Sequence, residues 1–338
     1  MRKGGSDYPA VADGGPGLVP DGGARYVADG GPGRVAVGLG SAVQHHGELF
    51  QGAVRRGEEL VRCLITMPGR GVGSTARYWG RGLLGEGSVE VVPAWKQKAA
   101  RAASLALAHL GAPVEGRLEI ECSVATGVGL GSSTSDVVAA IRAVASACGA
   151  SLDVGTVARL AVEAEGASDP IMYDREMVLF AQRQGRVLES FGTWIPRYAV
   201  MSFDADPAAG GVDTLGLPVP AYYSDELAAF ENMVARAREA FGRRDSGALA
   251  SLAAIATESA TLNQRFLPLW NFDPIRRLAE EAGALGLQIS HSGTIGGLLF
   301  EPRAVRDDVT LEERIAVCLR SFGARPLGLF GSGTPASD

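Results

Sequence analysis

Apolar and polar positions follow two different periods along the chain from about residue 35 onward. The segment 117–123 (RLEIECS) alternates with a period of two, which predicts a half-buried strand. The alanine-rich segment 95–110 repeats its apolar residues every three to four positions, which predicts a helix. Short apolar runs predict further strands at 35–39, 59–66, 88–92, 177–180, 187–191, 198–204, 286–292, 298–301 and 325–330. Helical periodicity and N-cap residues predict further helices at 133–147, 153–165, 225–241, 246–263, 273–284 and 311–322.

The order of these elements predicts the fold class. Strands and helices are mixed without a regular strand–helix–strand alternation, which favours an α+β fold with two lobes. We expect a first lobe at 35–195 and a second at 196–338, with the division inside 192–222. Residues 1–34 contain VADGGPG twice, at 11–17 and 27–33, and have too few apolar groups to offset the entropy of ordering. We therefore expect residues 1–34 to form a flexible tail.

Composition and charge narrow the function classes. Apolar residues make up 46% of the 338 residues, which is enough for a core. The 32 basic and 38 acidic side chains give a net charge of −6, which argues against nucleic acid as a partner. No apolar run is long enough to span a membrane, and no secretion signal is visible, so we expect a cytoplasmic protein without a membrane partner. The four cysteines are far apart and predict neither a zinc site nor a disulfide framework.

The strongest chemical signal is a glycine-rich turn before a predicted helix, TGVGLGSSTSD at 126–136. Glycines allow the backbone to approach an anion closely, and the start of the following helix supplies free N–H groups. The spacing is neither that of a Walker A loop nor that of a Rossmann turn. A tight strand-to-helix turn without a ligand is the alternative. The residues that would contact phosphate are Gly127, Gly129, Leu130, Gly131, Ser132, Ser133 and Thr134.

Three segments together resemble the motifs of the GHMP kinase superfamily. They are HHGELFQG at 45–52, GLGSSTS at 129–135 and ISHSGTIGGLLF at 289–300, and the resemblance extends over about residues 35–330. The GELxQG form is most similar to the L-threonine kinase branch of cobalamin assembly. The proline that usually precedes the second motif is missing, and Val124 and Ala125 stand in that stretch. The resemblance implies a ribosomal S5 domain 2-like first lobe that binds nucleotide, a ferredoxin-like second lobe, and the cofactors ATP and Mg²⁺.

The resemblance also suggests the catalytic and metal-binding residues. Asp169, in AEGASDPIMYD, would accept the proton of the acceptor hydroxyl or orient that hydroxyl; a simple Asp-Pro turn is the alternative. Ser133 and Glu165 would complete a magnesium site, with Glu163 as the alternative to Glu165.

The first and third segments supply the candidates for substrate binding. His45 and His46 are neighbours, so in an extended segment they point to opposite faces, and we do not expect them to chelate one metal. One of the two is expected to contact the substrate, and we choose His46. The substrate-binding candidates are His46, Glu48, Gln51, His291, Ser292 and Gly293.

These features together predict an ATP-dependent kinase with a small-molecule substrate. The γ-phosphoryl group would pass to a hydroxyl of L-threonine or a related hydroxy amino acid. A sugar or isoprenoid alcohol kinase is the first alternative, and a decarboxylase of the same fold also uses ATP. A non-catalytic ligand-binding regulator is the alternative from another class. For the oligomeric state, a homodimer and a monomer are both compatible with the sequence.

Overall fold

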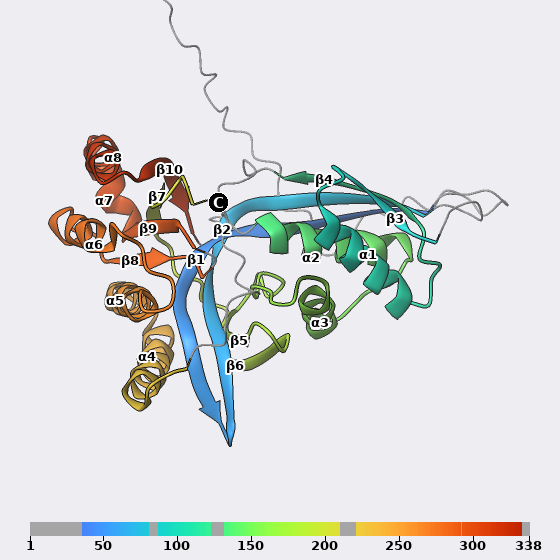
Figure 1. Ribbon diagram of the computed structural model, residues 1–338, viewed down its shortest axis with the longest axis horizontal. Helices are drawn as coiled ribbons and strands as arrows, with labels where there is room; N and C mark the ends of the chain where they lie inside the picture. Colours follow the sequence, from blue (N-terminus) through green and yellow to red (C-terminus); the bar gives the residue numbers. More distant parts are fainter. Residues whose placement is uncertain (1–35, 81–86, 123–131, 210–220, 292, 333–338) are drawn as a thin grey trace, which may run out of the picture.

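The computed structural model describes residues 36–80, 87–122, 132–209, 221–291 and 293–332. A long antiparallel hairpin, formed by β1 (Val37–Arg56) and β2 (Glu59–Trp79), runs through the molecule (Figure 1). The sequence predicted only a short strand at 35–39, but β1 continues through the segment HHGELFQG. Its pairing with β2 shifts register several times between Ala42 and Phe50, and Gly47 there has a φ of 57°. The hairpin therefore bends at its middle while staying paired at both ends.

The first sheet is built on this hairpin. Its strands are ordered β3-β4-β2-β5-β6, and β1 pairs with β2 outside that path. The pair β3–β4 is parallel and the other pairs are antiparallel. The remaining strands are β3 (Val89–Val92), β4 (Gly116–Cys122), β5 (Met177–Ala181) and β6 (Arg186–Gly192). The helices of this lobe are α1 (Gln97–His109), α2 (Ser132–Ala147) and α3 (Val154–Glu165).

Helix α2 lies very close to β1. A Cβ atom added at Gly38 would lie 2.0 Å from the carbonyl oxygen of Ala143, and one at Gly40 would lie 2.2 Å from that of Ala139. Only glycine allows this approach, because any side chain would meet the helix backbone. The contact fixes α2, and with it Ser132–Thr134 at its start, against the hairpin.

The second sheet has the order β10-β7-β9-β8 and is antiparallel. In chain order these strands are the fourth, first, third and second, which is the order of a ferredoxin-like fold, as predicted. The strands are β7 (Ala199–Asp204), β8 (Gly286–Ile289), β9 (Ile295–Phe300) and β10 (Arg325–Gly331). The helices are α4 (Ser224–Arg243), α5 (Ser246–Asn263), α6 (Phe272–Glu281), α7 (Pro302–Asp307) and α8 (Leu311–Ser321).

Two sequence predictions in this lobe were wrong in detail. The short helix α7 was not predicted, because six residues are too few to show a helical period. Helix α6 starts at Phe272, one residue before the predicted start at 273, and Asn271 occupies the N-cap position.

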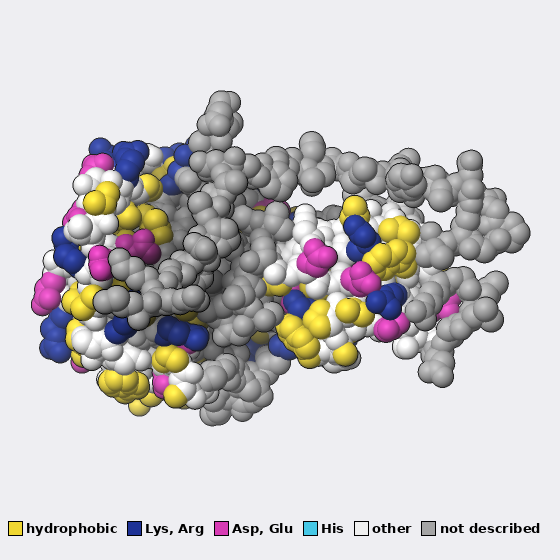
Figure 2. Space-filling view, turned by 90° about the horizontal axis from the view of Figure 1, so that it is seen from above, with side chains coloured by type: hydrophobic (Ala, Val, Ile, Leu, Met, Phe, Trp, Pro, Cys, Tyr) yellow, Lys and Arg dark blue, Asp and Glu magenta, His cyan; other side chains and the backbone are white. Residues whose placement is uncertain are grey.

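The apolar core joins the two lobes. One cluster packs hairpin residues such as Leu49, Phe50 and Val54 against helices α4 and α5 and strand β7. Among the described residues, none of the helices combines the length and hydropathy that crossing a membrane requires. In the view of Figure 2, acidic and basic side chains are interspersed over the described surface.

Candidate active site

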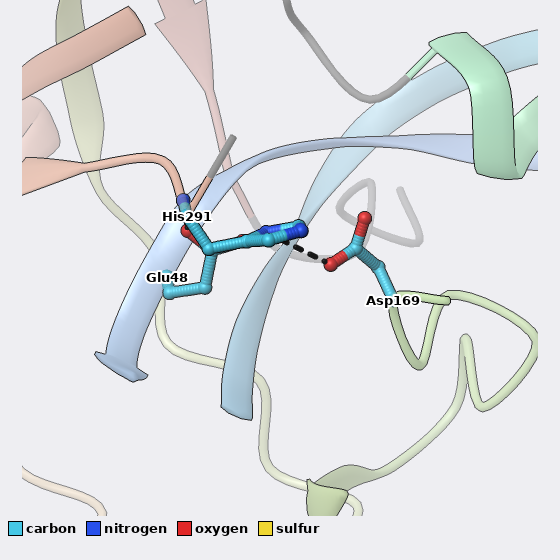
Figure 3. A group of neighbouring side chains, drawn as sticks. All are labelled: Glu48, Asp169 and His291. Atoms are coloured by element: carbon cyan, nitrogen blue, oxygen red, sulfur yellow. Dashed lines mark hydrogen bonds and ion pairs between the residues drawn. The ribbon is translucent and has the colours of Figure 1, made fainter. Parts of the chain in front are cut away.

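Three polar side chains meet where the hairpin bends. Glu48 comes from β1, Asp169 from the turn between α3 and β5, and His291 from the turn between β8 and β9. Figure 3 shows the His291 ring beside Glu48 and pointing toward Asp169. One oxygen or nitrogen of each residue lies within 4.8 Å of the other two. The hairpin and both lobes therefore contribute to one site.

Glu48 holds His291 by two contacts. The backbone N–H of His291 donates to Oε2 of Glu48 over 2.8 Å, and Nδ1 of the ring lies 2.9 Å from Oε1. The same Nδ1 lies 3.5 Å from Oδ1 of Asp169. The Glu48 side chain has no exposed surface, whereas the His291 side chain is 24% exposed. His291 is therefore the member of the three that solvent or a substrate reaches most easily.

His45 reaches Asp169 from the other side. Its Nε2 lies 3.1 Å from Oδ2 of Asp169, and both side chains are buried. The contact is an ion pair when the His45 ring carries a proton. In a regular strand His45 and Glu48 would lie on opposite faces, because they are three residues apart. The register shifts and the positive φ of Gly47 break this alternation, so both side chains approach Asp169.

The cluster is electrically balanced. Burial alone would raise the pKa of Asp169, but the charges of His291 and His45 outweigh it and hold that pKa well below its usual value. Burial alone would lower the pKa of His291, but Asp169 and Glu48 outweigh it and raise that pKa to about 9. The pKa of His45 is raised too, because Asp169 and Glu48 overcome the effect of burial. Asp169 therefore stays ionised at neutral pH, beside the protonated ring of His291.

A second polar group adjoins the first at the start of α2. The hydroxyl of Ser133 donates to Oε2 of Glu165 over 3.2 Å, and that of Thr134 donates to Oε1 over 3.0 Å. The Thr134 hydroxyl also lies 3.4 Å from Oδ2 of Asp169, so it links the two groups. Burial raises the pKa of Glu165 to about 7. Hydroxyl and carboxylate oxygens are the donors that Mg²⁺ prefers, so Ser133 and Glu165 fit a magnesium ion.

Sequence reasoning missed a buried anchor under the start of α2. The ammonium of Lys96 lies 2.6 Å from Oδ2 of Asp136, and the hydroxyl of Ser74 donates to Oδ1 over 2.6 Å. These contacts tie the first turns of α2 to β2 and to the segment before α1. One feature of the sequence could have indicated a special role for Lys96, because the chain has only three lysines.

The other predicted residues are placed as follows. Ser132 begins α2, and Gly293 lies in the turn beside His291 with a φ of 132°. His46 is fully buried and bonds to Ser202 (2.8 Å) and Gln288, so the structure brings His45 rather than His46 to Asp169. The Gln51 amide donates to the carbonyl of Ile289 over 3.4 Å. The predictions for Gly127, Gly129, Leu130, Gly131 and Ser292 lie outside the described residues.

Residues 97–172 match the family model of the GHMP kinases N terminal domain, which runs from α1 to just beyond Asp169. The L-threonine kinase of Citrobacter freundii is 25% identical over 194 residues, which are 57% of this chain and 65% of that protein. The matched region is thus slightly less than two thirds of that relative.

Solved structures share the fold at low sequence identity. The homoserine kinase of Cytophaga hutchinsonii superposes with a TM-score of 0.60 at 16% identity, over 88% of this chain and 95% of that one. The mevalonate diphosphate decarboxylase of Staphylococcus aureus gives 0.59 at 14% identity, over 89% and 97%. Residues 97–172 therefore match a GHMP kinase N-terminal domain, and the two-lobed fold is similar to that of a solved homoserine kinase and a solved decarboxylase.

Proposed function

We propose that this protein is an ATP-dependent kinase that transfers the γ-phosphoryl group to the hydroxyl of a small hydroxy amino acid, with L-threonine as the first candidate. The observation that carries the proposal is the contact of two polar groups through Thr134. One group, Ser133 and Glu165, has the donors for a magnesium–nucleotide complex. The other contains the buried, ionised Asp169.

Phosphoryl transfer requires alignment and charge neutralisation more than covalent help. Magnesium, when bound with the nucleotide, would neutralise phosphate charge. Ser133 and Glu165 would hold it, and the anchor of Lys96 on Asp136 would keep α2 in place beneath it. Asp169 would accept a hydrogen bond from the acceptor hydroxyl and orient it toward the phosphate. Its lowered pKa makes it a weak proton acceptor, so we assign it orientation rather than early proton removal.

Two features favour an amino acid as the acceptor. The cluster offers both signs of charge, carboxylates and imidazolium groups, as binding of an ammonium and a carboxylate requires. The curated relative with 25% identity is an L-threonine kinase. The structural relatives support the fold and leave the acceptor open, so a sugar or isoprenoid alcohol is the competing outcome.

The test is turnover of Mg-ATP by the purified protein with a panel of acceptors. L-threonine, L-serine and L-homoserine represent the proposal, and a sugar and mevalonate represent the alternative. ADP release is measured together with the mass of the phosphorylated product. We expect O-phospho-L-threonine, and no ADP above background with L-2-aminobutyrate, which lacks only the hydroxyl.

Two variants of helix α3 test whether Glu165 helps to bind the magnesium–nucleotide complex. Glu165→Gln should reduce turnover strongly, whereas Glu163→Gln, on the exposed face of the same helix, should not. Phosphorylation of only the sugar or mevalonate would overturn the substrate class and keep the kinase. ATP binding without any phosphorylated product would favour the non-catalytic regulator.

A further inference from the structure

Glu48, Asp169 and His291 are three side chains of the kinds that bind metal ions, and one carboxylate alone would be enough to orient a hydroxyl. It brings two carboxylates and one imidazole together with donor atoms 2.9 and 3.5 Å apart on two edges. Donor atoms that bind one transition-metal ion at about 2.0–2.2 Å lie roughly 3.0–3.4 Å from each other. Two of the three edges are therefore close to those of a coordination sphere, and the third, between the two carboxylates, is at most 4.8 Å long.

A second observation comes from the unused lone pairs of the cluster. Asp169 is buried, and its Oδ1 has no hydrogen-bond partner among the described residues. This oxygen has the His291 ring at 3.5 Å as an ion-pair partner but makes no hydrogen bond to the described part of the chain. A buried carboxylate oxygen without a hydrogen bond costs free energy, so its free lone pair marks a place where a ligand is expected. This oxygen lies on the side of His291, as the dashed line in Figure 3 shows.

We propose that Glu48, Asp169 and His291 bind one divalent first-row transition-metal ion. Two carboxylates balance its charge, and an imidazole nitrogen selects Mn²⁺, Fe²⁺ or Zn²⁺ over Mg²⁺. His45 pairs with the other oxygen of Asp169 and would orient that ligand from outside the coordination sphere. This site is distinct from Ser133 and Glu165, which offer oxygen alone.

Metal binding changes the protonation of the cluster. His291 Nδ1 lies at hydrogen-bond distance from Glu48, so it must lose any proton it carries before it can coordinate. Three protein ligands leave coordination positions that water or the acceptor can fill. This contact with the acceptor rests on the proposed function, whereas the metal site itself does not.

The test uses the full chain, stripped of metal with a chelator and titrated with Mn²⁺ in the absence of nucleotide. Electron paramagnetic resonance counts the bound ions, and its pulsed form detects the ¹⁴N nucleus of a coordinated imidazole. We expect about one ion per chain with a ¹⁴N coupling, and release of a proton as the ion binds. This readout needs no variant, so it holds even if a substitution prevents folding. Absence of a stoichiometric ion, or a bound ion without nitrogen coupling, would overturn the site.

Matched variants test which residues coordinate the bound Mn²⁺ ion. Glu48→Gln should weaken Mn²⁺ binding at least about tenfold, and His291→Ala should remove the nitrogen coupling. Glu58→Gln removes an exposed carboxylate of the same hairpin and should change neither. Glu165→Gln should keep the nitrogen-coordinated ion, and its loss in that variant would place the ion at the nucleotide site instead.

The same preparation separates this proposal from the kinase proposal. Stripped protein that phosphorylates L-threonine with Mg-ATP but binds no Mn²⁺ with nitrogen coupling would overturn the metal site and leave the kinase intact. If the protein binds nitrogen-coordinated Mn²⁺ but phosphorylates no acceptor, the kinase proposal is overturned and the metal site is kept.

Discussion

Adjacent residues of one strand serve opposite purposes in this molecule. His45 faces Asp169, and that carboxylate helps to raise its pKa. His46 faces the second sheet, where burial and the charge of His45 lower its pKa to about 3, so it stays neutral. The neutral ring can then pair with Ser202 and Gln288, which ties the hairpin to β7 and β8. A strand thus places a histidine that pairs with a carboxylate directly beside a neutral histidine that serves the packing of the two lobes.

Asp169 provides the sharpest prediction at this scale. Asp169→Asn keeps the size of the side chain and removes the charge that pairs with the protonated His291 ring. We expect kcat to fall roughly 10²-fold while ATP affinity is nearly kept, because the neutral amide accepts the hydrogen bond of the hydroxyl more weakly and orients it less well. Steady-state kinetics together with nucleotide titration measures both quantities.

The control for this variant is Asp174→Asn. Asp174 lies five residues further along the same segment and pairs with Arg142 instead of the cluster. We expect near-normal kcat from it. Asp169→Asn with wild-type kcat would show that this carboxylate has no part in the reaction.

The packing of α2 on β1 decides where the start of that helix lies. The face of α2 toward the strand carries Ala139, Ala143 and Ala147, each four residues apart, and meets Gly38 and Gly40. Small residues on both surfaces bring the two backbones together. Because Ser133 and Thr134 begin the same helix, this contact also sets the distance between the nucleotide side of the site and Asp169.

Gly40→Ala tests this packing. Its Cβ would lie 2.2 Å from the backbone oxygen of Ala139, so helix or strand must shift. We expect the free energy of unfolding to fall by about 1–3 kcal/mol, as overpacked cores show. Urea unfolding measures the change. In Gly242→Ala the new Cβ meets nothing within 4 Å, and α4 should gain up to about 1 kcal/mol, because alanine favours a helix. Equal stability of both variants would contradict the close approach.

Features that depend on neighbouring residues are predictable from this sequence, whereas contacts between distant residues are not. The helix periods were predicted because apolar repeats are a local property of the chain, whereas the ferredoxin-like strand order was expected only from the resemblance to the GHMP kinases. Glu48, Asp169 and His291 were named as candidates from their motifs, and the structure brings them together. The role of His45 was not predicted, since it depends on register shifts that alter which face a side chain takes. The anchor between Lys96 and Asp136 was missed because its residues are 40 positions apart in the chain.

At the scale of the whole molecule, the two lobes share one core. The cluster around Leu49 and Phe50 in the hairpin is completed by Phe230 and Met233 of α4 and by α5. The ring of Phe50 meets that of Phe230 edge to face at 5.9 Å. The boundary between the lobes at 195/196 stays a prediction. Apolar side chains from both sides of it pack in the same core cluster.

We therefore expect a fragment of residues 35–195 to be unable to fold alone. Without α4 and α5 the buried face of the hairpin would be exposed to water, at a cost of about 25 cal/mol per Å² of apolar surface. Thermal unfolding followed by circular dichroism should show one cooperative transition for the full chain and none for the fragment. A fragment with a sharp transition near that of the full chain would show that the first lobe is independent.

The far end of the hairpin has a practical consequence. Residues 55–60 are exposed there, and Gly57 makes the turn with a φ of 63° and open space around it. Figure 1 shows this end projecting away from the bend that carries Glu48. Exposed loop tips tolerate insertions well. A short peptide epitope or a fluorescent label placed beside Gly57 would thus report on the tumbling and location of the molecule without touching its chemistry.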